Sequence, residues 1–248
     1  MSRFVKTPNL PEGKADTLIC GSDDKHILNF FARENIRIIK NEKNPCIDPA
    51  ISFHADISAL HLGGRRLLID KKQERLKNEL VLLGCEVFDT EEEIKGAYPG
   101  DVKLNFTIAG EYAVGNFTLA DSRLPELIRY KKKLNVKQGY SKCSTLVVRE
   151  NALITDDPSI HRVASENGFD SLLISKGDIR LSGHEYGFIG GASGKISPDT
   201  VVFFGDILKH RDFEKIKAFL LKHGCDYVCT DKRELRDIGG IVVLTENE

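Results

Sequence analysis

The sequence predicts a single α/β domain over residues 1–248, built as a ring of five repeated strand and helix units. Two observations predict the repeat: apolar runs that end in aspartate recur about every 45 residues, and an amphipathic segment follows each of them. A third observation predicts the ring. The chain begins inside one unit and ends with the strand that this unit lacks, so we expect the two ends of the chain to pair and complete it.

The composition is that of a globular protein. Hydrophobic residues make up 41% and charged residues 29% of the 248 residues, which excludes a disordered or collagen-like chain. The formal net charge is -1, so no overall positive field attracts nucleic acid or an anionic membrane surface. No apolar run reaches the roughly 18 residues of a membrane-spanning helix. We therefore expect a cytoplasmic location, with neither nucleic acid nor membrane as a partner.

The six cysteines are scattered along the chain, which indicates reduced thiols rather than a disulfide framework. Cys225 and Cys229 are the closest pair, but their spacing is not that of a zinc knuckle, and the segment has the pattern of a strand. The sequence therefore predicts no metal site.

The aspartates that end the apolar runs stand where helix N-caps belong, because a carboxylate there accepts free backbone N–H groups and faces the positive end of the helix dipole. They are Asp23 and Asp24, Asp70, Asp121, Asp156 and Asp157, and Asp206. Helices are expected over 27–35, 74–84, 124–133, 160–168 and 213–224. Left-handed helix ends are expected at Gly84, Gly168 and Gly224, each followed by a short strand. Most of the aspartates are thus predicted to be caps.

A further strand is expected before each of these units, which makes the repeat ββαβ. The leading strands are read at 55–64, 101–110, 142–148, 187–196 and 237–245. The alternative is an open three-layer α/β sheet, because that architecture also alternates strands and helices. Five copies of the paired strands favour the ring.

Chemistry is expected where the leading strands begin, because in a radial array these strands converge on the axis. Their starts carry His54 and Asp56, Asp101, Cys143, Gly190 and Gly191, and Asp237. His54 and Asp56 are two residues apart on an expected strand and so project to one face. An imidazolium close to Cys143 would lower the pKa of its thiol, as a cysteine nucleophile requires.

These short motifs, HAD, KCST, IGGA and CGSDD, follow the same cyclic order as in the pentein, or guanidine-modifying enzyme, superfamily, which the chain resembles along essentially its whole length. Arginine deiminases, agmatine deiminases and dimethylarginine dimethylaminohydrolases belong to this superfamily. The resemblance implies a five-bladed α/β-propeller of pseudo-fivefold ββαβ units, closed by the N- and C-terminal segments. It also implies a small guanidino or amidino substrate and no cofactor.

Residue by residue, the resemblance implies that Cys143 is the nucleophile, His54 the general acid and base, and Asp56 a neighbouring carboxylate that contacts substrate. Asp23 matches the acidic residue that holds a guanidinium, although a pure helix cap is an equally good interpretation of it. The implied reaction is hydrolysis of a C–N bond through a covalent thiouronium-type intermediate on Cys143.

The chain departs from the superfamily pattern at one position. Where Glu-Gly-Gly-Asp is expected, it has Ile189, Gly190, Gly191 and Ala192, so a carboxylate that grips the guanidinium is missing. Candidates to replace it are Asp101, Glu185, Asp237 and Asp24. The alternatives are that the substrate is less cationic or that the site does not catalyse. Two alternatives to the hydrolase stay open: a non-catalytic pentein that binds a partner, as ribosome anti-association factors do, and an amidinotransferase.

Overall fold

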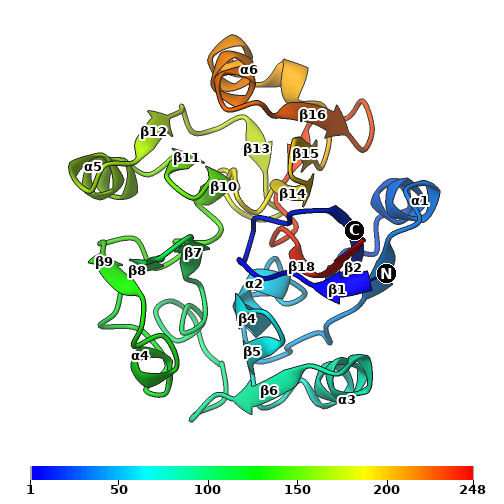
Figure 1. Ribbon diagram of the computed structural model, residues 1–248, viewed down its shortest axis with the longest axis vertical. Helices are drawn as coiled ribbons and strands as arrows, with labels where there is room; N and C mark the ends of the chain where they lie inside the picture. The colour runs from blue at the N-terminus through cyan, green and yellow to red at the C-terminus, as the bar shows by residue number, and fades with distance from the viewer. Residues whose placement is uncertain (1, 248) are drawn as a thin grey trace.

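The computed structural model describes residues 2–247, and its strands form separate small sheets around a common centre (Figure 1). Four sheets have three strands and another has four, and all five share one arrangement. A leading strand pairs antiparallel with a second strand, a helix follows, and a third strand returns parallel to the second. The predicted ββαβ repeat is therefore confirmed. Within the described range, no single sheet closes around the centre.

Four of the units follow one another along the chain. The first contains β4 (Ala59–Gly63), β5 (Arg66–Ile69), α3 (Glu74–Leu83) and β6 (Glu86–Asp89). The second contains β7 (Thr107–Ala109), β8 (Tyr112–Gly115), α4 (Leu124–Leu127) and β9 (Lys132–Asn135). The third contains β10 (Thr145–Arg149), β11 (Ala152–Thr155), α5 (Pro158–Glu166) and β12 (Asp170–Leu173). The fourth contains β14 (Ser193–Ser197), β15 (Thr200–Phe203), the 3-10 helix η1 (Ile207–Lys209), α6 (Phe213–Lys222) and β16 (Asp226–Cys229).

Both ends of the chain build the remaining unit, as the sequence predicts. Its leading strand is β18 (Val242–Asn247), which pairs antiparallel with β2 (Lys14–Ile19). Helix α1 (Lys25–Arg33) follows, and β3 (Arg37–Ile39) returns parallel to β2. A short β1 (Ser2–Phe4) covers the other edge of β18, so the two termini lie side by side (Figure 1).

Side-chain packing joins each sheet to the next. Five buried apolar clusters are present, and each draws residues from two neighbouring units. In one of them, Leu76 and Leu80 of α3 pack with Ile19 of β2 and Leu244 of β18. Because the clusters link the units in turn and the last link returns to the first unit, the hydrophobic effect holds the units in a ring without a continuous sheet.

The predicted caps are confirmed at two of the five expected helices. The side chains of Asp24 and Asp157 accept N–H groups of α1 and α5. Asp206 instead caps the unexpected 3-10 helix η1, and α6 begins only after Asp212. Asp70 and Asp121 instead accept N–H groups of the turns that lead to α3 and α4. These two helices begin three residues beyond the aspartate or later, so each carboxylate meets turn N–H groups first. The three predicted helix-ending glycines all have left-handed φ angles.

Helix α4 is shorter than the expected 124–133, since it ends at Leu127 and Lys132 already begins β9. An unexpected two-stranded ribbon pairs β13 (Ile179–Arg180), which lies between the third and fourth units, with β17 (Leu235–Arg236), which lies between the fourth unit and β18. No helix in the described range is long and apolar enough to cross a membrane.

The leading strands begin later than the sequence suggests. A short helix, α2 (Ala55–Ser58), takes the place of the expected strand start, so His54 and Asp56 do not lie on one strand. Ser58 donates its hydroxyl to the carbonyl of His54 and closes this helical turn. Cys143 and Asp237 also precede their strands, which start at Thr145 and Val242. His54, Cys143 and Asp237 therefore lie on segments that precede the leading strands and not on the strands themselves.

Candidate active site

The turns before β4 and β10 bring three of the predicted residues together. An imidazole nitrogen of His54, a carboxylate oxygen of Asp56 and the Sγ of Cys143 all lie within 4.8 Å of one another, and all three side chains are buried. The Cys143 thiol donates to Asp56 Oδ2 over 2.7 Å. These atoms also have the spacing of a metal-binding group, in which the thiol proton would have to leave before a metal could bind.

Asn105 fixes the position of the thiol, although the sequence analysis did not single it out. Its Oδ1 accepts the backbone N–H groups of Lys142 and Cys143, at 2.8 and 3.1 Å. These two bonds fix the orientation of the amide, so the Nδ2 donates to Cys143 Sγ over 3.3 Å and to the carbonyl of Asp56 over 3.2 Å. The only sequence signal for this role is that Asn105 is a polar residue inside the apolar run LNFTI. In the structure it is fully buried.

Asp237, one of the candidates to replace the carboxylate missing at Ala192, lies beside His54. Ala192 lies in an apolar cluster, whereas Asp237 Oδ1 lies 3.8 Å from His54 Nδ1. The Asp237 carboxylate accepts the backbone N–H groups of Phe188 and Gly239, at 2.9 and 3.0 Å, so its orientation is fixed. A carboxylate therefore lies beside the imidazole, but it comes from the segment before β18, one unit beyond the segment that carries Ala192.

The glycines of the two Gly-Gly motifs allow these segments to approach closely. A Cβ on Gly191 would lie 1.9 Å from Asp237 Oδ1, and one on Gly239, which has φ of +75°, would lie 2.4 Å from the Cβ of His54. A Cβ on Gly190 would overlap backbone carbonyls around Cys143. Gly190 and Gly191, which the sequence places at a leading-strand start as candidate substrate-binding residues, do not line the cavity above Cys143. They instead make room for the turns that carry Cys143 and Asp237.

Burial keeps the resting thiol protonated. The pKa of Cys143 is raised well above its ordinary value by desolvation and, secondarily, by the negative charges of Asp56 and Asp237. Desolvation also raises the pKa of Asp56 to about 6, even though His54 and Lys142 act in the opposite direction. The expected lowering of the Cys143 pKa is therefore not found, because desolvation and the carboxylates of Asp56 and Asp237 raise this pKa instead.

A cavity of about 580 Å³ opens above Cys143, His54 and Asp237. Its walls carry the aromatic rings of Tyr98, Tyr140, Tyr186 and Phe188 and the carboxylates of Asp48, Asp101 and Glu185. This volume suits a small molecule, and the mixture of aromatic rings and carboxylates suits a cationic one.

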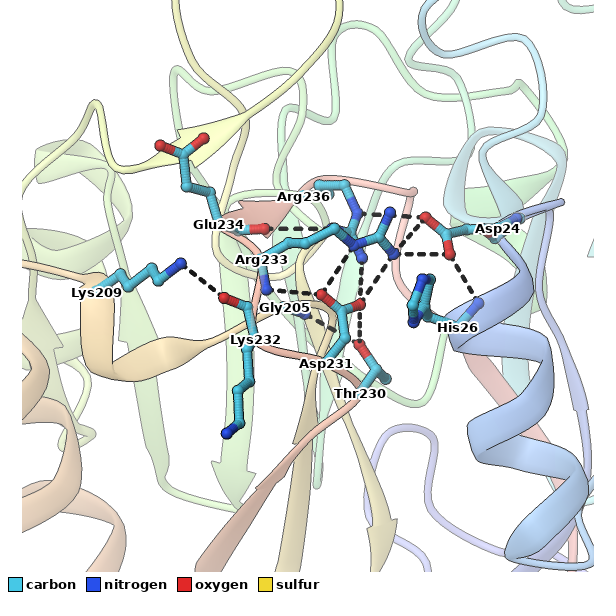
Figure 2. A network of polar contacts seen from close by, with 11 residues as sticks. Asp24, His26, Gly205, Lys209, Thr230, Asp231, Lys232, Arg233, Glu234 and Arg236 are labelled. Carbon is cyan, nitrogen blue, oxygen red and sulfur yellow. Dashed lines mark hydrogen bonds and ion pairs between the residues drawn. The ribbon is translucent and has the colours of Figure 1, made fainter.

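Two of the aspartates considered as ligands lie elsewhere. Asp23 is exposed, forms an ion pair with Lys40 and does not line the cavity. Its neighbour Asp24 caps α1 and forms an ion pair with Arg233 (Figure 2). The role that the resemblance implies for Asp23 is therefore not compatible with its position, because its carboxylate is directed toward Lys40 at the surface.

We expect Asn105→Ala to lower the free energy of unfolding by about 1–3 kcal/mol, because it leaves two buried backbone N–H groups without their acceptor. It also removes the hydrogen bond that lowers the pKa of Cys143, so alkylation of that thiol should slow at neutral pH. Denaturant titration and a timed alkylation assay test both effects. Asn167→Ala is the matched control, since this exposed side chain only donates to the carbonyl of Val163.

The fold is similar to that of several solved enzymes that modify guanidino groups. Inosamine-phosphate amidinotransferase from Streptomyces griseus has a TM-score of 0.62 and 10% identity, with 99% of this chain and 98% of that chain covered. Agmatine deiminase from C. jejuni has a TM-score of 0.53 and 15% identity, covering 93% and 91%. DDAH from Pseudomonas aeruginosa has a TM-score of 0.53 and 10% identity, covering 94% and 99%. The chain thus has the fold of the pentein superfamily.

Within that fold, the chain belongs to a family of unknown function, DUF6873, whose model matches residues 18–242. No curated protein matches the sequence.

Proposed function

We propose that this protein is a cysteine-dependent hydrolase of a C–N bond in a guanidino or amidino compound. The observation that carries the proposal is the buried contact of Cys143 with Asp56, next to His54, at the floor of an acidic and aromatic cavity. We further propose that the five units are the blades of a pseudo-fivefold propeller in a single cytoplasmic domain.

A cationic substrate would stabilise the negative charges around Cys143. Asp56 and Asp237 flank the thiol, and burial opposes the charged forms of both the thiol and Asp56. A guanidinium or amidinium beside these carboxylates stabilises them and also stabilises the thiolate, so binding of the correct ligand activates the nucleophile. Its planar N–H groups match carboxylate oxygens in pairs.

The proposed reaction balances without a cofactor. The Cys143 thiol loses its proton along its hydrogen bond to Asp56, and Sγ bonds to the amidino carbon. The C–N bond then breaks, and His54 protonates the departing amine or ammonia. His54 next takes a proton from water, whose oxygen bonds to the same carbon. The C–S bond then breaks, and the departing thiolate takes its proton back from Asp56. A guanidine thereby yields a ureido product and an amine or ammonia.

The burial of these polar groups favours chemistry over a purely binding role. A thiol, an imidazole and two carboxylates are each at least nine-tenths buried at the centre of the ring, where apolar side chains would cost less free energy. An amidinotransferase is the second candidate, because a transferase is among the solved structures with the same fold. It would share the covalent step and pass the amidino group to an amine instead of water.

Labelling with chloroacetamidine tests the proposal. This cationic reagent should alkylate Cys143 at least about tenfold faster than neutral chloroacetamide does at pH 7, since a neighbouring opposite charge shifts a pKa by one unit or more. Chloroacetamide, which has the same leaving group but no charge, should modify the exposed Cys46 first, and its reaction with Cys143 should accelerate as the pH is raised. Peptide mass mapping locates the adducts. An amidine adduct on another cysteine, or no adduct at all, contradicts the proposal.

A further inference from the structure

The cavity above Cys143 is strongly acidic, although the whole chain is nearly neutral. Asp48, Asp101, Glu185 and Asp237 line it, and no lysine or arginine of the described residues does. The overall charge of -1 does not explain this local excess. Two imidazoles, those of His54 and His184, are the only basic side chains among the lining residues. Asp48 is already paired with His184 over 3.0 Å. The carboxylates of Asp101, Glu185 and Asp237 remain, which is more negative charge than one guanidinium would neutralise.

Asp101 is the clearest sign of a second cationic group. Its side chain is buried, with 1% exposed, and its Oδ2 accepts the hydroxyl of Tyr140 over 2.7 Å. Its Oδ1 is also buried and has no hydrogen-bond partner among residues 2–247. Desolvation raises the pKa of this carboxyl group, so a cation beside it would be stabilising. Buried polar atoms without a partner are rare, and this one belongs to a residue that lines the cavity, so a ligand that donates here would satisfy it.

Aromatic rings surround the same part of the cavity. The rings of Tyr98 and Tyr140 have centroids 5.7 Å apart, and those of Tyr140 and Phe188 are 6.0 Å apart. A ring face attracts an ammonium group electrostatically and also packs against the methylenes that carry it. Tyr140 binds Asp101 and lies on the turn that carries Cys143, where its carbonyl accepts the N–H of Ser144. The turn that carries Cys143 therefore also contacts Asp101 through Tyr140.

A neighbouring cavity of about 820 Å³ contains basic residues, but they are already paired (Figure 2). Arg236 bonds to Asp231 and Arg180 to Glu234, and Lys209 donates to the carbonyl of Lys232. Occupied cations are poor partners for the carboxylate or phosphate of a ligand. Among the described residues that line the cavity above Cys143, the charged side chains other than the two histidines are therefore all acceptors.

We infer that the substrate is a dication, with a guanidino or amidino group at Cys143 and a second cationic group, an amine or another guanidine, bound by Asp101 among the aromatic rings. This inference rests on the proposed function. It names the class of substrate that the site selects: compounds of the ω-aminoalkylguanidine kind rather than guanidino acids or guanidino phosphates.

The test compares three alkylguanidines of matched length that end in an ammonium, a methyl or a carboxylate group. We expect kcat/KM to be highest for the ammonium compound, roughly 10- to 100-fold above the methyl compound, as one charged hydrogen bond would give. The carboxylate compound should be the poorest. Equal or better turnover of the carboxylate compound overturns the inference and leaves the proposed hydrolase intact. No turnover of any of them, together with no chloroacetamidine adduct, overturns the proposed function itself.

Asp101→Asn assigns the preference to one residue. It should lower the ratio of kcat/KM for the ammonium compound to kcat/KM for the methyl compound from roughly 10- to 100-fold to no more than a few-fold. Asp48→Asn gives a second measurement in the same cavity if the first variant does not fold. Glu126→Gln, an exposed acid-to-amide change on α4, should leave the ratio of the two substrates unchanged. A ratio unaffected by both Asp101→Asn and Asp48→Asn overturns the inference.

Discussion

Replacing Cys143 with serine should abolish turnover of alkylguanidines, with kcat reduced at least about 1,000-fold. A hydroxyl is much harder to ionise than a thiol, and the same burial and the same two carboxylates oppose its ionisation. The covalent intermediate should disappear with it. Steady-state kinetics and intact-protein mass spectrometry after a rapid quench measure both losses.

Binding should survive in this variant, which separates a chemical role from a structural one. The carboxylates of Asp56 and Asp237 remain in place, so a cationic ligand should still raise the melting temperature of Cys143→Ser. Cys46→Ser, which changes an exposed thiol outside the cavity, should retain wild-type kinetics. Residual turnover of more than a few per cent in Cys143→Ser would rule out Cys143 as the nucleophile.

The repeated architecture could be read from the sequence because its signals are local. Each apolar run, its aspartate and the amphipathic segment after it lie within one unit, and the same pattern occurs five times. The pairing of β18 with β2 was predictable because the unit at the N-terminus lacks a leading strand and the chain ends with one. The boundaries of the leading strands were less predictable, since hydrogen bonds such as Ser58 to His54 convert their first residues into turns.

Site residues were predictable only where the side chain is of a type that commonly takes part in catalysis. His54, Asp56 and Cys143 drew attention as an imidazole, a carboxylate and a thiol at equivalent points of the repeat. Asn105 carries no such signal, because its role depends on the backbone of a segment in the next unit. The protonation of Cys143 could not be read either, since it depends on burial and on Asp237, which is distant in sequence.

Replacing His54 with glutamine should separate the two halves of the proposed reaction. Glutamine is similar in size but exchanges no protons, so kcat should fall by about 10²- to 10⁴-fold, the usual contribution of a general acid and base. Alkylation by chloroacetamidine should continue at a rate within several-fold of wild type, because the thiol proton leaves along the hydrogen bond to Asp56. Timed labelling and steady-state kinetics on one preparation test the separation.

The control is His161→Gln, which changes a helix histidine that bonds to Ser171 and does not line the cavity. It should leave both labelling and turnover unchanged. With an alkylguanidine, His54→Gln should also accumulate the amidino adduct of Cys143 if water activation becomes slower than amine release, and mass spectrometry would detect it. Unchanged turnover in His54→Gln would remove the imidazole from the mechanism. Loss of labelling with an unchanged melting temperature would instead assign to His54, rather than to Asp56, the removal of the thiol proton.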